Sequence, residues 1–385
     1  MRMRIISTMV WTMVSMLIYS CSKDDTEPVI NTGDVKNVAV KVSTLKSRAI
    51  ENSVPTGTIT PVQDAAMLFY TGNTLSYTHV LSAGDIAGMG GGADKSMIID
   101  NVPMSADSIA FVANYIVSGQ GTSYAGISGS TTIDVQNLQP MPGSAGNEVS
   151  KVIMYGGGKI GPLNTATNIA DANFTASPIA ARLEVSGIGK KGNGMNIGDI
   201  TQFTLVGVFI PNHYPTGNIR ECISTSATTG FGNGVLVKPA NVNYAASFPN
   251  VSGTPYLSDF NAAGLPALGA SSVYGYNLFP AAGAENLPNV VIAVKDVKYI
   301  NTLGVETDWQ NGNVQYITVT DYFTTPDISE TAPRYTQFKN ANVYGIKSLL
   351  FGLGDLGDEP YSKAKRVAVT LTVLPWTYQE IYPGI

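Results

Sequence analysis

The stretch NVAVKVSTLKSRAIENS, residues 37–53, joins two unlike segments of the chain. Val38, Val40 and Val42 alternate with small or polar residues, and this period of two predicts a β-strand with one buried face. Lys46 and Arg48 follow at once, in polar sequence that suits a trypsin-like protease. A strand made for a core is therefore followed directly by a place where the chain can be cut.

The rest of the chain repeats the strand pattern. Gly, Pro, Asn or Asp separate nearly all of the apolar segments, and no stretch of about 12 residues carries a helical apolar stripe. This pattern predicts an all-β fold, with two β-sandwiches in tandem. The predicted strands are 65–72, 108–117, 132–138, 149–157, 179–188, 200–211, 288–300, 312–323, 339–351 and 365–376.

Length and composition agree with this fold class. The 385 residues are enough for two domains, and 40 Gly, 21 Pro and 19 Tyr suit short strands joined by turns. Only 13% of the residues are charged, against about 25% in an ordinary globular protein. The net charge of −5 offers no basic stripe for nucleic acid, so no nucleic-acid partner is expected.

The N-terminus reads as a targeting segment. Arg2 and Arg4 precede an apolar run that ends near Ile18, and Ser20 is the small residue before Cys21. The polar, acidic sequence SCSKDDTEP then follows as a tether, so we predict a lipoprotein signal with Cys21 as the lipidated residue. The alternative is an ordinary secretory signal that happens to contain a cysteine. With Cys21 lipidated, Cys222 has no disulfide partner and is expected to be a small packed residue.

Sequences that resemble nucleotide sites do not carry the required context. GIGKKG (187–192) matches G-x-G-x-x-G, but a strand rather than a helix follows it, which favours glycines in a hairpin loop. YGGGKIG (155–161) lacks the Ser or Thr that a phosphate loop needs after its lysine. We therefore predict no cofactor.

Catalytic and metal-binding constellations are also missing from the sequence. His79 and His213 are far apart and have no neighbouring nucleophile, and no G-x-S-x-G occurs. GLGDLGDEP (352–360) lacks the regular spacing of a calcium loop and reads as a solvated turn. No catalytic residue and no metal site is predicted, and the chain is not expected to be an enzyme.

The order of the features resembles a known family. After the lipoprotein signal, the tether and the early strand come FVANY (111–115), IMYGG (153–157), PIAARLEV (178–185), VYGIKSLLF (343–351) and RVAVTLTVLPW (366–376). This order resembles the fimbrillins, the major fimbrial subunits of Bacteroidales-type bacteria (type V pili). The resemblance implies two transthyretin-like β-sandwiches, export to the outer membrane as a surface lipoprotein, removal of the first strand by a trypsin-like protease, and assembly by strand exchange.

The resemblance also implies a division of the chain. Residues 1–21 would be the signal and lipidation site, and 22–48 the tether and removable strand. Cleavage after Arg48 would leave Ala49 as the first mature residue, with Lys46 as the competing site. Residues 49–215 and 216–385 would be the two sandwich domains.

The C-terminal segment is expected to be the exchanged strand. Four aliphatic residues lie on one face of it, namely Val367, Val369, Leu371 and Val373, and Trp376 would act as a plug beyond them. The alternative is that 367–373 is the last core strand of the C-terminal domain.

The sequence thus predicts a structural stalk subunit of a surface fimbria that contributes to adhesion. Its partners would be other fimbrial subunits, including copies of itself, the outer membrane before processing, and host or bacterial surface receptors. The alternative is a fimbrial tip adhesin that binds a carbohydrate or a protein. In that case the tyrosines of SVYGYNLFP (272–280) could stack on a sugar, although they also fit an ordinary strand.

Overall fold

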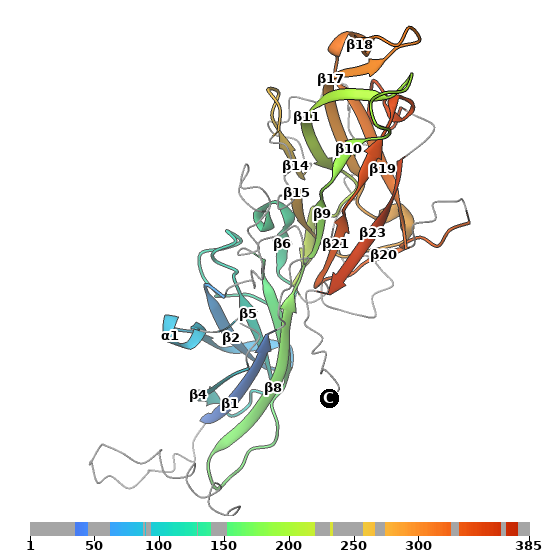
Figure 1. Cartoon of the computed structure of the whole chain (residues 1–385). Helices are drawn as coiled ribbons and strands as arrows, with labels where there is room; N and C mark the ends of the chain where they lie inside the picture. The colour runs from blue at the N-terminus through green and yellow to red at the C-terminus, as the bar shows by residue number, and fades with distance from the viewer. Residues whose placement is uncertain are drawn as a thin grey trace, which may run out of the picture.

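The computed structural model describes residues 35–44, 62–87, 89, 94–128, 130–139, 152–219, 232–233, 257–265, 274–324, 331–362 and 367–375. These residues form an elongated body built almost wholly of β-strands, with the early strands at one end and the late strands at the other (Figure 1). The all-β prediction is therefore confirmed. Within the described part of the chain, none of the helices is both long and apolar enough to span a bilayer.

A seven-stranded system forms the N-terminal end, in the order β3-β2-β5-β7-β8-β1-β4. Strand β1 pairs with β8 and β4, whereas β2 and β5 lie in the part of the path that continues from β7. The short helix α1 (Ala83–Ile86) follows β3 and is capped by Ser82. The strands are β1 (Val35–Thr44), β2 (Ala65–Thr71), β3 (Thr74–Val80), β4 (Lys95–Pro103), β5 (Ser108–Ala113), β7 (Met154–Lys159) and β8 (Ile169–Pro178).

A nine-stranded system forms the C-terminal end, in the order β14-β11-β17-β19-β23-β21-β9-β15, with β18 paired to β17. The strands are β9 (Ala181–Val185), β11 (Ile200–Ile210), β14 (Leu257–Phe260), β15 (Tyr274–Leu278), β17 (Val290–Ile300), β18 (Glu306–Asp308), β19 (Gln315–Phe323), β21 (Asn342–Ile346) and β23 (Val367–Pro375).

Short elements complete the fold. The paired strands are β10 (Ile188–Lys190) with β22 (Leu349–Phe351), β12 (Thr216–Asn218) with β6 (Thr132–Asp134) and β13 (Gly232–Asn233), and β16 (Ala281–Ala282) with β20 (Gln337–Phe338). The 3₁₀ helices are η1 (Val135–Leu138), η4 (Ala284–Asn286), η5 (Gln310–Gly312) and η6 (Leu353–Asp355).

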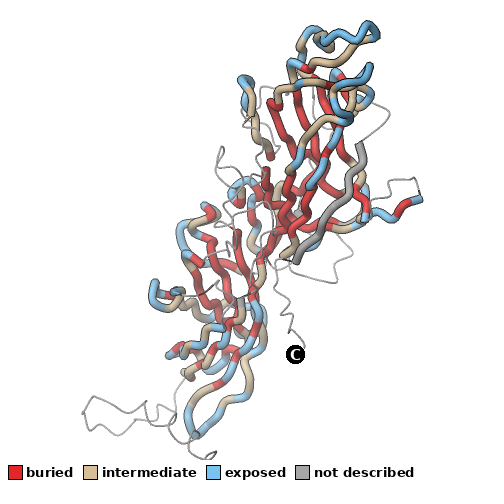
Figure 2. Tube along the Cα trace, viewed as in Figure 1, coloured by how far each residue is buried: buried red, intermediate tan, exposed pale blue. Residues whose placement is uncertain are grey.

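Two large apolar clusters hold these layers together (Figure 2). One cluster lies under β1, β4 and β8 and includes Met67 and Phe111 from β2 and β5. The opposite faces of β2 and β5, with Leu68 and Val112, belong to a second cluster that continues into the C-terminal strands. Because β2 is buried on both faces, its sequence is a continuous apolar run rather than an alternation.

Several predicted boundaries need correction. The chain passes from the N-terminal to the C-terminal system between Pro178 and Ala181, earlier than the boundary near 215 that the sequence suggested. The two residues of this crossing, Ile179 and Ala180, are fully buried, so composition gave no sign of a linker. Residues 132–138 are only partly strand, because the side chain of Asp134 accepts a hydrogen bond from the Gln136 N–H and starts η1.

Candidate functional site: the slot filled by the first strand

Strand β1 lies between two neighbours along most of its length. It pairs in parallel with β8, from Asn37 opposite Ile169 to Thr44 opposite Ala176. On its other side it pairs antiparallel with β4, from Val35 opposite Pro103 onward. Strand β4 is the last strand of this path, so it is joined to the sheet through β1. Removal of β1 would therefore open a slot with an unpaired strand edge on each side.

The predicted inward face of β1 is confirmed. Val38, Val40 and Val42 are at most 1% exposed and belong to the N-terminal apolar cluster. This cluster also contains Phe69, Phe111, Phe174, Ile99 and Val102. The slot is thus apolar at its base and offers backbone hydrogen bonds at both edges.

Lys36, near the start of β1, is buried on the same side as the valines. Its ammonium group donates to the carbonyl oxygens of Ala106 at 2.6 Å and Met104 at 3.2 Å. Burial lowers the pKa of Lys36, and the negative charge of Asp107 partly opposes this shift. A charged group at this depth is stabilised by such donor contacts, so Lys36 fixes this end of the strand.

The other end of β1 is held by an exposed carboxylate. Asp94 accepts from the Lys41 ammonium at 2.6 Å and from the Ser43 hydroxyl at 2.7 Å. These hydrogen bonds lower the pKa of Asp94, and the bond from Lys41 is the largest cause. Lys41 and Asp94 are each about half exposed, at 48% and 46%, so salt and water screen this contact. The strand is therefore held more weakly at its C-terminal end, the end that leads toward Arg48.

The residues just before β2 are firmly anchored. The carboxylate of Asp64, just before β2, accepts from the backbone N–H groups of Ile116 at 3.0 Å and Val117 at 2.9 Å and from the Tyr124 hydroxyl. The side chain of Asn114 accepts from the Gln63 N–H at 2.8 Å. The start of β2 is thus fixed by contacts that do not involve β1.

Strand β23, the predicted exchanged strand, is paired differently from β1. Its first part, from Val367 to Thr370, pairs in parallel with β19, and its second part, from Leu371 to Pro375, pairs antiparallel with β21. No residue of β23 takes part in both pairings. In its own chain this strand therefore lies between β19 and β21 in the sheet path, and each of its two parts pairs with one of these neighbours.

The remaining predicted site residues lie outside the described residues, namely Cys21, Arg48, Ala49 and Trp376, as do Lys46 and Cys222. For Val367, Val369, Leu371 and Val373 the structure defines the backbone pairing within β23. The structure therefore defines the β1 slot, whereas the roles proposed for the processing and lipidation residues stay predictions.

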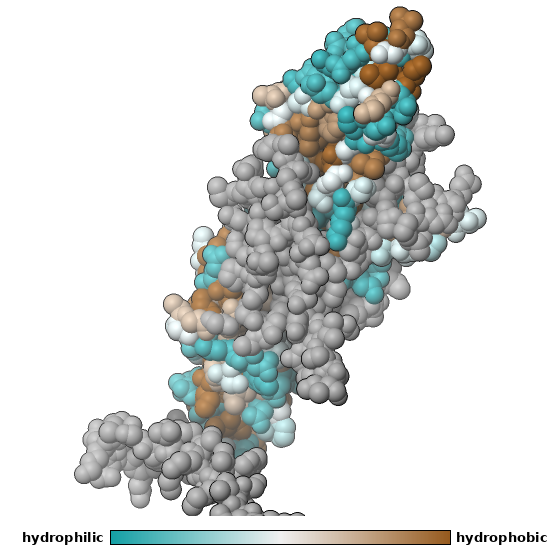
Figure 3. All heavy atoms as spheres, in the orientation of Figure 1, coloured by the Kyte–Doolittle hydropathy of each residue, from teal (hydrophilic) through white to brown (hydrophobic). Residues whose placement is uncertain are grey.

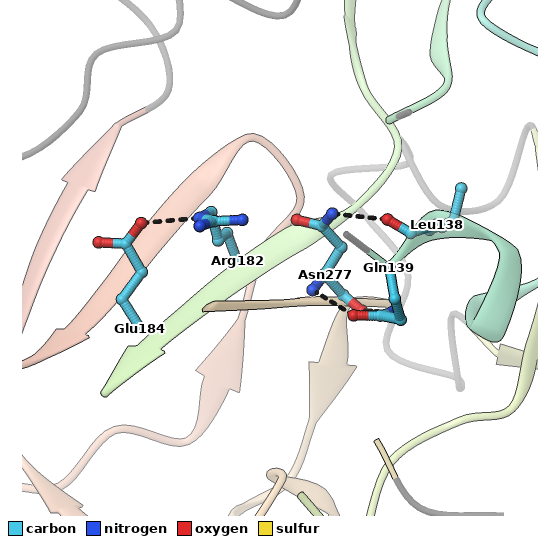
Figure 4. A network of polar contacts seen from close by, with 5 residues as sticks. All are labelled: Leu138, Gln139, Arg182, Glu184 and Asn277. Atoms are coloured by element: carbon cyan, nitrogen blue, oxygen red, sulfur yellow. Dashed lines mark hydrogen bonds and ion pairs between the residues drawn. The ribbon is translucent and has the colours of Figure 1, made fainter. Parts of the chain in front are cut away.

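Buried polar contacts join η1 and the following Gln139 to β15 of the C-terminal strand system (Figure 4). The Asn277 side chain donates to the Leu138 carbonyl at 2.7 Å. The Gln139 side chain donates to the Asn277 carbonyl and accepts from the Asn277 N–H. On β9, next to β15, Arg182 and Glu184 form an ion pair at 2.7 Å that is at most 4% exposed. Because buried polar groups are costly to leave without hydrogen bonds, the contacts of Asn277 and Gln139 resist movement between η1 and β15.

The tyrosines considered for sugar binding are part of the core. Tyr274 and Tyr276 of β15 are 6% and 3% exposed. The Tyr276 hydroxyl donates to the Asp259 carboxylate at 2.9 Å, and burial is the main reason that the pKa of Asp259 is raised. The interpretation of these residues as strand aromatics is therefore the correct one.

An exposed apolar surface lies instead at the end of the molecule where β17 and β18 are found (Figure 3). Its side chains come from the loop before β11 and from the β17–β18 hairpin, and they are Met195, Ile197, Leu303 and Val305. The exposed fraction of Leu303 reaches 83%. Among the described residues, no group of three or more His, Cys, Asp or Glu side chains is placed to hold a metal ion.

Sequence reasoning identified the valines of β1 but missed Lys36. A readable signal existed, because Lys36 falls on the same period of two as Val38, Val40 and Val42 and must therefore point inward. Its partners, the carbonyl groups after β4, could not be inferred from the sequence.

Comparisons with known proteins reach the same fold. No sequence-family model and no curated protein matches the chain. A "putative cell adhesion protein" from Bacteroides eggerthii is 15% identical, with a TM-score of 0.50 over 90% of this chain and 98% of that one. Another, from Parabacteroides distasonis, is 13% identical, with a TM-score of 0.51 over 89% of this chain and 100% of that one. A fimbrilin from Porphyromonas gingivalis is 15% identical, with a TM-score of 0.49 over 89% and 98%.

At these identities the similarity is one of fold. The two neighbours with TM-scores of 0.50 and 0.51 are both described as putative cell adhesion proteins. The chain is therefore an all-β protein that shares the fold of these two putative cell adhesion proteins.

Proposed function

We propose that the chain is a structural stalk subunit of a surface fimbria. In this proposal it is exported as a lipoprotein on Cys21, cleaved after Arg48 so that Ala49 becomes its first residue, and polymerised by strand exchange. The observation that carries the proposal is the position of β1, which is the first strand of the described residues, is paired on both sides, and comes just before the predicted cleavage site. Loss of such a strand leaves a slot that only another strand can fill.

The apolar contributions favour exchange. Burial of Val38, Val40 and Val42 contributes about 4.5–9 kcal/mol, taking about 1.5–3 kcal/mol for each valine. The four aliphatic residues of 367–373 would contribute on the order of 6–12 kcal/mol in the same slot. An incoming C-terminal segment is therefore a stronger occupant than the strand it replaces.

The pairing of β23 also favours transfer of this segment into the β1 slot of a second copy. In its own chain each part of β23 has a strand partner on one side, whereas the β1 slot offers β8 and β4 on both sides. Transfer of the segment to a second copy would add a second row of backbone hydrogen bonds. This gain helps to offset the cost of leaving its own sheet.

The two sheet systems correspond to two proposed domains, and we place their boundary between Pro178 and Ala181 rather than near 215. The proposed role is structural and non-enzymatic, at the cell surface. The description of the fold neighbours as adhesion proteins supports this placement.

A tip adhesin is the second candidate function, and the exposed apolar end formed by Met195, Ile197, Leu303 and Val305 favours it. A receptor that recognises this surface would be a protein rather than a sugar, because the patch is aliphatic. Immunogold labelling of filaments separates the candidates, since a stalk subunit labels along the shaft and an adhesin labels one end.

Two variants of the full chain test the stalk proposal. Arg48→Ala is expected to leave the protein on the membrane as an uncut monomer, with Lys46→Ala as the matched control for the neighbouring basic residue. Deletion of residues 366–385 is expected to leave a folded, processed subunit that does not elongate. Normal filaments from either variant would contradict the proposal, and degraded protein after the deletion would favour a purely internal role for β23.

A further inference from the structure

The segment that forms β1 and the segment that forms β23 share a sequence. Residues 36–45 read KNVAVKVSTL and residues 365–374 read KRVAVTLTVL. The lysine, the Val-Ala-Val run and the final leucine are identical, Val42 corresponds to Leu371, and Ser43 corresponds to Thr372. The C-terminal segment thus repeats the lysine and the three inward-facing aliphatic positions of the strand that fills the N-terminal slot, whereas Asn37, Lys41 and Thr44 correspond to Arg366, Thr370 and Val373.

Apolar residues alone do not fix where such a strand sits. A strand has a period of two, so a slip by two residues keeps the same side chains on the buried face. In 367–373 every second residue is valine or leucine, and each of these slips would still place aliphatic groups in the slot. A unique polar contact is needed to select one register.

The Lys36 site supplies such a contact. The carbonyl oxygens of Met104 and Ala106 lie 3.2 Å and 2.6 Å from the Lys36 ammonium, and Lys36 is only 7% exposed. The turn that presents them is fixed, because the Ala106 N–H donates to the Pro103 carbonyl at 3.0 Å. Asp107 follows directly, and its carboxylate accepts from the Gly72 N–H at 2.9 Å. When β1 leaves, these carbonyl groups lose the ammonium that occupied the site.

We propose that the carbonyl groups of Met104 and Ala106, beside Asp107, form a lysine site that sets the register of the incoming strand. The occupant is residues 365–374 of a second copy of this chain, and Lys365 takes the place of Lys36. This inference rests on the proposed function and adds the register to it. Val367, Val369 and Leu371 then replace Val38, Val40 and Val42, and Ala368 replaces Ala39.

One other lysine has the right parity. Lys363 lies two residues before Lys365, and placing it in the site would shift the strand by two. That shift would bring Lys365 to the position of Val38, which is fully buried among apolar side chains. An ammonium group buried there would lack the carbonyl contacts of the Lys36 site, so the Lys365 register is favoured. Arg366 corresponds to Asn37 and falls on the other face.

Disulfide trapping in isolated filaments tests the register directly. Ala39 lies opposite Ile98 of β4, and Ile98 is 56% exposed, so Ala368→Cys with Ile98→Cys is the matched pair. Strand neighbours at this spacing satisfy disulfide geometry. The full chain carries Cys222→Ser so that no other thiol remains in the mature part. A ladder of linked subunits is expected on non-reducing gels.

Ser96→Cys and Asp100→Cys, each paired with Ala368→Cys, report the two registers shifted by two residues. A ladder from either of these pairs, without one from Ile98→Cys, would overturn the register and leave strand exchange standing. Filaments that form but link through none of the three pairs would overturn strand exchange in this slot as well.

The role of the lysine is tested in the linked variant. Lys365→Met is expected to lower the yield of the Ile98→Cys ladder about tenfold and to spread linking to the shifted pairs, whereas Arg366→Met leaves the yield unchanged. Equal ladders from Lys365→Met and Arg366→Met would overturn the lysine site while leaving the proposed function intact.

Discussion

Replacement of Val40 by alanine is expected to loosen the strands on both sides of β1. Val40 is 1% exposed and lies opposite Met97 of β4 and Ala172 of β8. The change removes two buried methyl groups at about 0.8 kcal/mol each, and the cavity left in a well-packed core raises the total to about 2–3 kcal/mol. At about 1.4 kcal/mol per factor of ten, this corresponds to a 30- to 150-fold change in an opening equilibrium.

Hydrogen exchange of the uncut full chain measures this change. Amides of β4 and β8 that pair with β1 are expected to exchange about 30- to 150-fold faster in Val40→Ala, because release of β1 is the opening that exposes them. Lys41→Ala, on the exposed face of the same strand, is the control, and a change of less than about threefold is expected there because Lys41 is half exposed.

Equal exchange in the two variants would refute the reasoning. It would mean that β4 and β8 open without losing β1, and that the valines do not hold the sheet together at this point.

Three further predictions concern other parts of the chain. Gly156→Ala is expected to lower the unfolding free energy by about 1–3 kcal/mol, because its Cβ would lie 2.4 Å from the Thr175 carbonyl oxygen; Gly158→Ala, with nothing nearer than 3.5 Å, is the control, and equal melting temperatures would contradict the reasoning. Burial lowers the pKa of His213 from 6.5 to about 4, so the unfolded chain binds the extra proton between these values. Stability should therefore fall by up to about 3 kcal/mol as the pH drops from 6.5 to 4, and His213→Phe should flatten this slope in denaturation curves measured across that range. Cys21→Ala should abolish labelling by a fatty-acid analogue. Equal labelling of the variant and the wild type would show that another residue carries the lipid.

The strands that sequence reasoning found are those with large apolar residues. β11, β17 and β19 contain runs of Val, Ile, Leu and aromatic residues, and these runs match the predicted segments closely. β8 was missed although it alternates perfectly, because its buried face carries mainly alanines around Phe174. Alanine is common in every kind of structure, so a period of two built on it gives a weak signal.

The candidate site was only partly predictable for a related reason. The alternation of Val38, Val40 and Val42 is local and therefore visible in the sequence. The parallel partner of β1 lies more than a hundred residues away in β8, and a parallel pairing needs a long crossover that leaves no local pattern. The double pairing that makes β1 important is thus a property of the topology.

The two ends of β1 explain how one strand can be both secure and removable. Lys36 is buried and bonded to two carbonyl groups, whereas the contacts of Lys41 and Ser43 to Asp94 are exposed to solvent. Cleavage after Arg48 frees the chain beyond the exposed end but removes none of the valine contacts. On the proposed function, the cut strand therefore stays bound until a competitor arrives. Because fraying begins where contacts are weakest, the competitor enters from the cut end and displaces Lys36 last.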